Sequence, residues 1–408
     1  MQKKKEIVSS IWDEIFYSGK TNFSNHAFPL YLFTTRLYQE LTNKGTKDVL
    51  FMSREGQFLK TLFDKYLALR GELGLDCSPI NTHYFYGSRN SIMTASMGPL
   101  ETESFDHLFR FFRFFISAKM FLFSIGFNLS QIAQVRSSFG KDLDRICINF
   151  RSSNVFKRLK QNEDFRSIYD GIRQTQSNTF WAYVHSFGLN FSDGLVFVDI
   201  GYHGTMQDLI FKFFNQTVDT TGYFIKSRAH SVEHNRKIGL LGDANNPKLR
   251  GSKITKYDSF NYEQILRADH GRCLGYAFDD KRISQPILDK EFKDKEIFDN
   301  LVAPLQDEIL TKFERIARCC ECANIDDLCI VYFYHLIKNK SPDDYKWLLD
   351  MQDCHHDDFG YVGYPGKAFS RWLRKIAFRL KDKTFTFFKA GYVRKLKKSL
   401  RRHPFNGK

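Results

Sequence analysis

The sequence has no apolar run long enough to cross a membrane. A transmembrane helix needs roughly 20 consecutive, predominantly apolar residues, whereas charged side chains interrupt the richest apolar block, residues 105–127, at Asp106, Arg110, Arg113 and Lys119. The basic start M-Q-K-K-K is not followed by the apolar stretch of a signal peptide. We therefore expect no transmembrane helix, and we expect the protein to be in the cytoplasm.

Metal-binding motifs are also scarce. The eight cysteines occur without an export signal, which predicts reduced thiols rather than a disulfide framework. The nearest approach to a zinc motif is the group Cys319, Cys320, Cys322 and Cys329, followed by the C-H-H-D run at 354–357. This group holds one C-x-x-C and no second pair at a finger-like spacing, so we predict free cysteines, with zinc binding as the alternative.

Excess positive charge is missing from most of the chain and concentrated at one end. The net charge is +15, and residues 361–408 hold fifteen Lys or Arg against one acidic residue, Asp382. This tail therefore carries +14, which leaves +1 for residues 1–360. The body is nearly neutral and contains no recognisable nucleic-acid-binding module.

The tail has the pattern of two basic amphipathic helices, at 368–380 and 385–402, with Phe, Trp, Leu and Ile on one face of the first and Phe, Tyr and Leu on one face of the second. Such helices lie in the interface of an anionic membrane, and each basic residue adds about 1 kcal/mol near the surface. Nucleic acid would attract the same charge, but the apolar face favours lipid. The residues that we expect to bind the membrane are Trp372, Arg374, Lys375, Arg379, Lys397, Lys398, Arg401 and Arg402.

The most informative stretch is residues 194–214, G-L-V-F-V-D-I-G-Y-H-G-T-M-Q-D-L-I-F-K-F-F. The apolar run 195–198 predicts a buried strand, and 206–214 has the apolar spacing of a helix. Between them we expect a loop that carries the candidate site residues Asp199, Gly201, His203, Gly204 and Thr205, with Gln207 just inside the helix. Glycines and a helix N-terminus present backbone N–H groups that bind phosphate; an ordinary turn capped by Asp is the alternative.

Two further strands each deliver a Ser-Arg pair into the loop that follows. Ser53-Arg54-Glu55-Gly56 follows the apolar run 49–52, and Ser88-Arg89 ends a β-rich run that starts at Asn81. Arginine binds planar anions through a forked set of donors, which suits a diphosphate. In an α/β sheet, ligands bind at the carboxyl ends of the strands, where these arginines are expected.

Together these patterns predict an α/β fold with a Rossmann-like, mostly parallel sheet, a helical insertion and a helical C-terminal region. The predicted divisions are N-terminal helices (1–45), an α/β core (46–100 and 190–290), a helical insertion (101–189), a helical region (291–360) and the basic tail (361–408). In the insertion, we expect the aromatic stripe Phe109, Phe112 and Phe115 to form core rather than a sugar platform. The polar residues 229–256 are expected to form a mobile excursion over the site, and Glu263 is a further candidate on a following helix.

Three motifs in this order resemble the glycan phosphoribosyltransferase domain of bacterial ribofuranosyltransferases, which are found in surface-polysaccharide and capsule gene clusters. They are F-M-S-R-E-G-Q-F-L at 51–59, Y-F-Y-G-S-R-N at 84–90 and V-F-V-D-I-G-Y-H-G-T-M-Q at 196–207. The resemblance covers roughly residues 25–280. Many relatives carry a haloacid dehalogenase-type phosphatase domain and are described as such hydrolases. The D-x-D signature of that phosphatase is absent here, since Asp199-Ile200-Gly201 lacks the second Asp, so we do not predict hydrolase activity.

The resemblance implies that a 5-phosphoribosyl group passes from phosphoribosyl diphosphate to a hydroxyl of a lipid-linked glycan acceptor, and that a separate phosphatase then removes the 5-phosphate. Arg54 and Arg89, with Mg²⁺ as a candidate cofactor, would stabilise the leaving diphosphate. The loop 201–205 would hold the 5-phosphate. Asp199, Glu55 and Glu263 are candidates for the proton acceptor, with His203 as a further one. The family loop S-R-D-G is S-R-E-G here, which gives Glu55 a longer reach.

Two other functions remain open at this stage. A nucleotide-sugar glycosyltransferase would need a base-binding pocket, and the sequence has no D-x-D metal motif to support it. A non-catalytic scaffold would use the basic tail to recruit other glycan assembly enzymes to the inner face of the cytoplasmic membrane.

The tail prediction can be tested by deleting residues 366–408. The truncated protein should no longer co-sediment with vesicles that contain anionic lipid, because the deletion removes nearly all of the excess positive charge. Vesicles of neutral lipid are the control, and unchanged binding to anionic vesicles would contradict the assignment.

Overall fold

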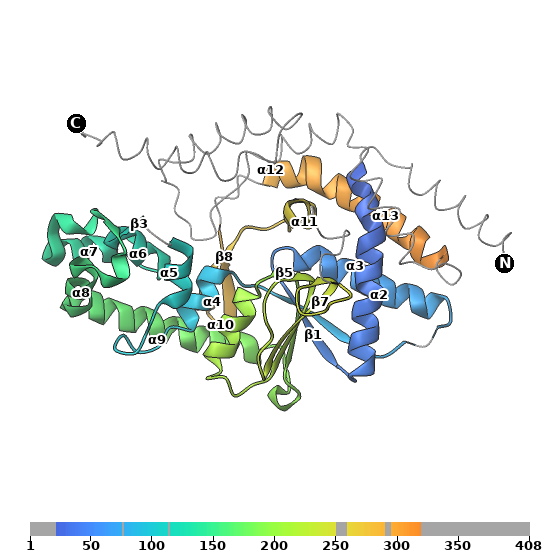
Figure 1. Ribbon diagram of the computed structural model, residues 1–408, viewed down its shortest axis with the longest axis horizontal. Coiled ribbons are helices and arrows are strands. Elements are labelled where there is room, and N and C mark those ends of the chain that lie inside the picture. Colours follow the sequence, from blue (N-terminus) through green and yellow to red (C-terminus); the bar gives the residue numbers. More distant parts are fainter. Residues whose placement is uncertain (1–21, 76, 113–114, 250–258, 290–294, 320–408) are drawn as a thin grey trace. The chain divides into compact units, whose positions relative to one another are not determined.

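The computed structural model describes residues 22–75, 77–112, 115–249, 259–289 and 295–319 (Figure 1). At its centre is a five-stranded parallel sheet in the order β2-β1-β5-β6-β7. The strands are β1 (Asp48–Met52), β2 (Asn81–Phe85), β5 (Leu195–Tyr202), β6 (Thr220–Ser227) and β7 (Asn235–Asp243). The predicted α/β fold with a parallel, Rossmann-like sheet is confirmed.

The order of the strands places a topological switch point between β1 and β5. From β1 the chain moves outward to β2 on one side, and it then returns to build β5, β6 and β7 on the other side. At such a point the flanking connections lie on opposite faces of the sheet, and a crevice opens outside the carboxyl ends of the two strands. The fold therefore defines one edge of the sheet as the expected ligand site.

Helices cover both faces of the sheet because its central strands are apolar on both sides. On one face, α2 (Ala27–Asn43), α3 (Gly56–Glu72) and α13 (Ala303–Cys319) share a buried core with Phe51 and Val198. On the other face, Phe197 meets Phe85, which in turn contacts Phe180 and Tyr183 of α9 (Glu163–His185). α4 (Arg89–Ala95) and α10 (Thr205–Phe213) follow β2 and β5.

The insertion forms a small helical body (Figure 1), and aromatic side chains make up its core. Phe105, Phe121, Phe165 and Tyr169 are buried, and Phe121 contacts Phe105 at 5.1 Å between ring centroids. Of the predicted aromatic stripe, Phe109 is half-buried and stacks on Phe121 with the ring centroids 6.0 Å apart, so its place in this core is confirmed. The side chains of Phe112 and Phe115 lie outside the described part of the structure. The elements of the insertion are α5 (Asp106–Phe112), β3 (Phe115–Ser117), α6 (Ala118–Ser124), α7 (Leu129–Phe139), η2 (Gly140–Leu143), β4 (Ile146–Ile148), η3 (Phe150–Ser152), α8 (Asn154–Gln161) and α9.

Two details of the predicted elements were wrong. Phe115 is not on the helix of Phe109 and Phe112, because it pairs with Ile148 in the two-stranded antiparallel sheet of β3 and β4. The segment 229–256 is not an excursion throughout, because its residues 235–243 form β7. Three polar residues of this strand, Asn235, Lys237 and Asp243, are buried and hydrogen-bonded; for example, Asp243 accepts a hydrogen bond from the Gly239 N–H at 2.9 Å.

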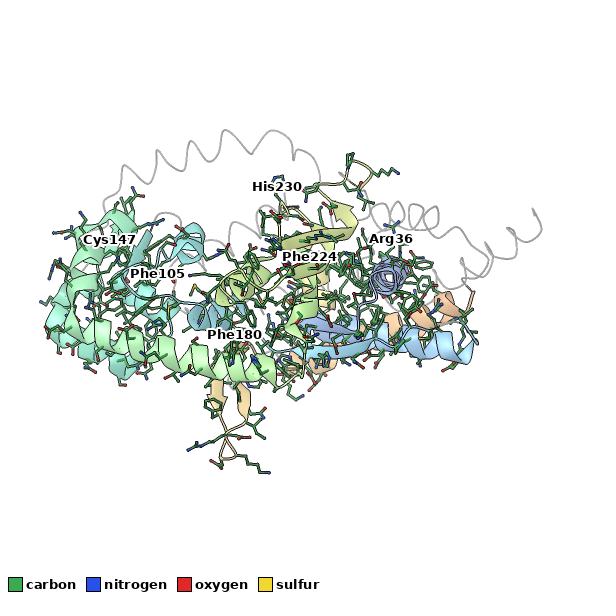
Figure 2. The ribbon with its side chains drawn as sticks, turned by 90° about the horizontal axis from the view of Figure 1, so that it is seen from below. Arg36, Phe105, Cys147, Phe180, Phe224 and His230 are labelled. Atoms are coloured by element: carbon green, nitrogen blue, oxygen red, sulfur yellow. The ribbon has the colours of Figure 1, made fainter. Side chains whose placement is uncertain are left out.

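The remaining described elements frame the sheet. They are η1 (Asn22–His26), η4 (Phe191–Asp193), α11 (Ser259–Ile265), a hairpin of β8 (Cys273–Phe278) and β9 (Ser284–Leu288), α12 (Lys295–Ile297) and the π-helical η6 (Phe298–Val302). The β8–β9 hairpin projects from the body (Figure 2). Among the described helices, none combines the length and the apolar character needed to cross a membrane. The predicted tail helices and the cysteines from 320 onward lie outside the described residues.

The close packing of β7 gives a stability test. A Cβ at Gly239 would lie 2.0 Å from the Gly242 carbonyl oxygen and 2.7 Å from the Ser227 nitrogen, and neither backbone atom can move freely. Gly239→Ala should therefore lower the free energy of unfolding by about 1–3 kcal/mol in urea titrations. Gly171→Ala is the matched control, because Gly171 is exposed in α9 with nothing within 4 Å. It should raise stability by roughly 0.5–1 kcal/mol. Equal effects of the two changes would contradict the packing of β7.

Candidate active site

Three turns meet at the carboxyl edge of the sheet, because the three strands before them are parallel neighbours. Phe51 of β1 pairs with Tyr84 of β2 and with Val198 of β5, so the three strands reach this edge in register. Ser53 joins the first two turns. Its N–H donates to the Phe85 carbonyl at 2.9 Å, and its hydroxyl donates to the Gly87 carbonyl at 2.6 Å and accepts from the Gly87 N–H at 2.8 Å.

Ser88 has a similar holding role in the second turn. Its side chain caps α4 by accepting the Ser91 N–H at 3.0 Å, and its hydroxyl also lies 2.7 Å from the Cys273 carbonyl oxygen. Because Ser88 is the N-cap, Arg89 becomes the first residue of the helix. Both predicted serines are thus at the site, and their hydroxyls are bonded to backbone groups that fix the arginine-bearing turns.

The glycines of the predicted site are required by close packing. A Cβ at Gly56 would lie 2.7 Å from the Phe51 carbonyl carbon. A Cβ at Gly201, which has a φ of +110°, would lie 2.0 Å from the Lys226 carbonyl oxygen. Gly204 is the N-cap of α10 in the left-handed region, with a φ of +62°. β5 continues to Tyr202, four residues beyond the predicted end at Val198, so the turn to Thr205 is shorter than expected.

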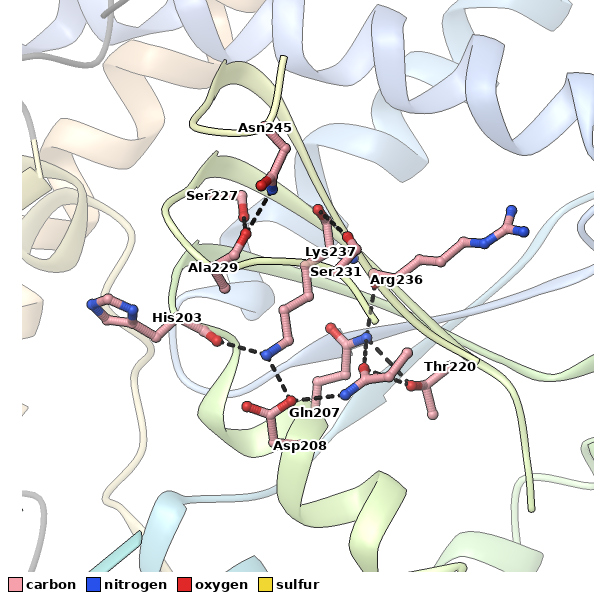
Figure 3. A network of polar contacts seen from close by, with 11 residues as sticks. His203, Gln207, Asp208, Thr220, Ser227, Ala229, Ser231, Arg236, Lys237 and Asn245 are labelled. Atoms are coloured by element: carbon pink, nitrogen blue, oxygen red, sulfur yellow. Dashed lines mark hydrogen bonds and ion pairs between the residues drawn. The ribbon is translucent and has the colours of Figure 1, made fainter. Parts of the chain in front are cut away.

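A buried lysine supports this turn from two strands away, and the sequence analysis missed it. Lys237 of β7 is 5% exposed. Its ammonium group donates to the His203 carbonyl at 2.9 Å and lies 2.6 Å from an Asp208 carboxylate oxygen (Figure 3). Lys237 lies in the polar segment 229–256, but nothing in that segment marks it as part of the site. Only the pairing of β7 with β6 brings Lys237 next to α10.

Gln207 belongs to the same network rather than to the open side of the turn. It is buried, and its Nε2 donates to Asn235 Oδ1 at 2.6 Å and to the Arg236 carbonyl at 2.9 Å. The side chain thus points from α10 toward β6 and β7 (Figure 3). Its role is to anchor α10, and the predicted contact of Gln207 with substrate is not supported by this orientation.

Arg54 and Glu55 present unpaired charges at the edge. Neither the guanidinium of Arg54 nor the carboxylate of Glu55 makes a hydrogen bond or an ion pair with any residue in the described part of the chain. Both side chains are partly buried. Their position at the carboxyl edge of a parallel sheet is where ligands bind in this architecture, so both charges are available to a ligand.

Asp199 lies at the same edge and is 8% exposed. Burial, and next the negative charge of Glu55, raise the pKa of its carboxyl group to about 7, although the N–H of Ile200 and the charge of Arg89 act to lower it. The effects of Glu55 and Arg89 on Asp199 connect the three turns electrostatically. Asp199 is therefore poised to gain or lose a proton near neutral pH.

His203 and Glu263 are the two remaining predicted candidates for the proton acceptor. His203 is exposed, and its ring points away from the Lys237 network (Figure 3). Glu263 is partly buried on α11, six residues before Asp269.

The segment after α11 reaches the site through other residues. Asp269 accepts from Gln57 Nε2 at 2.9 Å and donates its N–H to Gln57 Oε1 at 3.2 Å, which ties it to the start of α3. The Tyr84 hydroxyl lies 2.6 Å from His270 Nε2. The sequence offered a weak signal for these residues, since Asp269-His270 ends a predicted helix and Tyr84 begins the motif at 84–90.

The residues present fit a weakly held Mg²⁺ better than a structural metal. In the described residues there is no group of three or more His, Cys, Asp or Glu side chains suited to hold a metal. Mg²⁺ is commonly bound by one or two carboxylates together with substrate phosphates and water. Glu55 and Asp199 supply two carboxylates whose charges interact unfavourably.

Comparison with known proteins assigns no family to the chain, since no family model matches the sequence and no curated protein matches it significantly.

The raised pKa of Asp199 predicts a pH-dependent loss of stability. The unfolded chain releases this proton near pH 3.8, whereas the folded protein holds it to about pH 7. The free energy of unfolding should therefore fall as the pH rises from about 4 to about 7. Asp199→Asn removes this dependence and should be more stable than the wild type by roughly 2–4 kcal/mol at about pH 8. The check is urea unfolding across this range; parallel pH profiles for the two proteins would contradict the assignment.

Proposed function

We propose that this protein is a cytoplasmic glycosyltransferase that moves a 5-phosphoribosyl group from phosphoribosyl diphosphate to a glycan hydroxyl. The observation that carries the proposal is the meeting of the unpaired Arg54 and Glu55 with the buried Asp199 at the switch point of a parallel sheet. The three motifs that resemble the glycan phosphoribosyltransferase domain are the same three turns. Sugar diphosphates need cations at the leaving group and a carboxylate near the ring, and this edge offers both.

In the proposed reaction, the bond between the anomeric carbon and the diphosphate oxygen breaks, and a bond from the acceptor oxygen to that carbon forms. Positive charge develops on the ribose ring, and the electron pair leaves with the diphosphate. Arg54 and Arg89 stabilise the diphosphate as it leaves, since fixed cations act strongly in a partly buried site. Mg²⁺ bound through Glu55 would add positive charge beside the same phosphates.

Asp199 is the group proposed to accept the proton of the acceptor hydroxyl. A general base works best when its pKa lies near the operating pH, and burial together with Glu55 raises the pKa of Asp199 to about 7. The ionised form also favours the developing ring cation. Lys237 is assigned a positioning role, because it holds the turn whose backbone N–H groups would bind the 5-phosphate.

The location of the acceptor gives the tail its proposed role. A growing surface glycan is carried on a lipid, so the enzyme would act at the inner face of the cytoplasmic membrane, held there by the basic residues from 361 onward. The product keeps the 5-phosphate, so a separate phosphatase must follow, together with the other glycan assembly enzymes.

The test is incubation of the purified protein with phosphoribosyl diphosphate, Mg²⁺ and a glycan acceptor, followed by mass spectrometry for a pentose-phosphate increment. Arg54→Ala and Asp199→Asn should each lower kcat/KM by about 10²- to 10³-fold, as expected for loss of a transition-state contact. Arg158→Ala is the matched control, because that arginine pairs with Asp142 on the surface of the insertion, and it should leave activity unchanged. Full activity in a folded Arg54→Ala protein would overturn the proposal.

A further inference from the structure

Three aromatic rings gather beside the proposed donor site. Tyr84 and Tyr86 lie on and just beyond the end of β2, with their ring centroids 4.8 Å apart and the planes at 72°. The His270 ring lies 5.6 Å from Tyr84 and 5.0 Å from Tyr86. Tyr86 and His270 are partly exposed, so this group is not a closed part of the core.

The hydrogen bonds of the group divide it into a fixed part and an open part. His270 Nδ1 donates to the Gly271 carbonyl at 2.7 Å, so Nε2 accepts from the Tyr84 hydroxyl at 2.6 Å. Burial lowers the pKa of His270, which is consistent with this neutral form. Tyr84 and His270 are therefore locked together.

Tyr86 is held only through its backbone. Its N–H donates to the Tyr183 hydroxyl at 2.7 Å, and its carbonyl accepts from the Tyr276 hydroxyl at 2.8 Å. The Tyr86 hydroxyl itself makes no hydrogen bond with any residue that the structure describes. A rigidly held, partly buried phenol with an unused hydroxyl is suited to contact a ligand.

Asp269 provides a second open polar group. Its Oδ1 is bonded to Gln57, whereas no described residue bonds to Oδ2. Burial, and next the charge of Asp269, raise the pKa of Tyr86, and Asp269 directly precedes His270, whose ring lies 5.0 Å from that of Tyr86. The Tyr84 hydroxyl lies 3.4 Å from the Arg54 carbonyl oxygen, and Asp269 is bonded to Gln57 in the turn of α3 that follows Arg54, so the aromatic group borders the donor site.

We infer that Tyr86, Asp269 and His270 form a subsite for one sugar ring of the acceptor glycan, next to Arg54 and Glu55. A sugar ring presents a face of C–H groups, which packs on an aromatic ring, and hydroxyls, which donate to a carboxylate. Tyr86 supplies the ring and a hydroxyl, and Asp269 supplies the free carboxylate oxygen. His270 shapes the wall of the subsite through its bond to Tyr84.

A nucleobase is the competing occupant of such a group. The rings of Tyr84 and Tyr86 meet edge to face at 72°, so no parallel slot is available between them for a flat base. A partly exposed ring beside an exposed carboxylate suits a sugar better. The inference rests on the proposed function, because it assigns the acceptor of that reaction.

The test uses the full-length protein and saturation-transfer NMR with methyl glycosides of glucose, galactose, mannose, rhamnose and N-acetylglucosamine as probes. At least one glycoside should bind the wild type. Tyr86→Ala should weaken that binding at least about tenfold, as expected for loss of a stacking contact, and Asp269→Asn should also weaken it. Matched controls are Phe278→Ala, an exposed ring on the β8–β9 hairpin, and Asp280→Asn, an exposed carboxylate, both of which should bind normally.

Several outcomes would overturn the subsite. They are no binding of any glycoside by the wild type, equal loss in the control variants, or binding of uridine monophosphate that depends on Tyr86 while glycoside binding does not. Calorimetric titration with phosphoribosyl diphosphate and Mg²⁺ measures donor binding by itself, so failure of the subsite can be told apart from failure of the proposed function. Tyr86→Ala should bind this donor normally. If the wild type binds no donor but binds a glycoside through Tyr86, the subsite stands and the donor assignment fails.

Discussion

The site depends on the parallel pairing of β1 with both β2 and β5. Parallel neighbours in register end at the same edge, so three turns that are separated by up to about 150 residues in the sequence are brought together. Ser53 then fixes the first turn to the second through Gly87. Without this pairing, Arg54 and Arg89 would be ordinary surface cations and Asp199 an ordinary loop carboxylate.

Burial changes the acid–base chemistry of the residues that meet at this edge. Asp199 lies among apolar strands with Glu55 nearby, and the combined effect raises the pKa of its carboxyl group toward neutrality. Lys237 and Gln207 have no open polar side at this edge. They fix α10 and the turn before it through polar contacts that are enclosed by β6 and β7. The protein thus separates the residues that hold the turns from those left open at the edge.

Each residue of the predicted site either holds a turn in place or stays open at the edge of the sheet, and its residue type does not reveal which. Ser53, Ser88 and Gln207 looked like ligand contacts, yet their side chains are occupied by backbone or neighbouring groups. Arg54 and Glu55 remain open. Tyr86 and Asp269 attracted less notice in the sequence, because a tyrosine after a strand and an aspartate after a helix are common. Their significance comes from their unused polar atoms and from their position beside Arg54.

The sequence by itself determined the class of fold, the strands β1, β2 and β5, and the edge of the sheet where the arginines and Asp199 lie. Those features follow from local patterns, since apolar runs build buried strands and the turn residues after them have few conformations available. Only the tertiary structure decided that 235–243 is a strand, that Lys237 supports the β5–α10 turn and that Asp269 and His270 join the site. These depend on contacts between distant segments, and buried polar residues that satisfy one another leave no periodic pattern in the sequence.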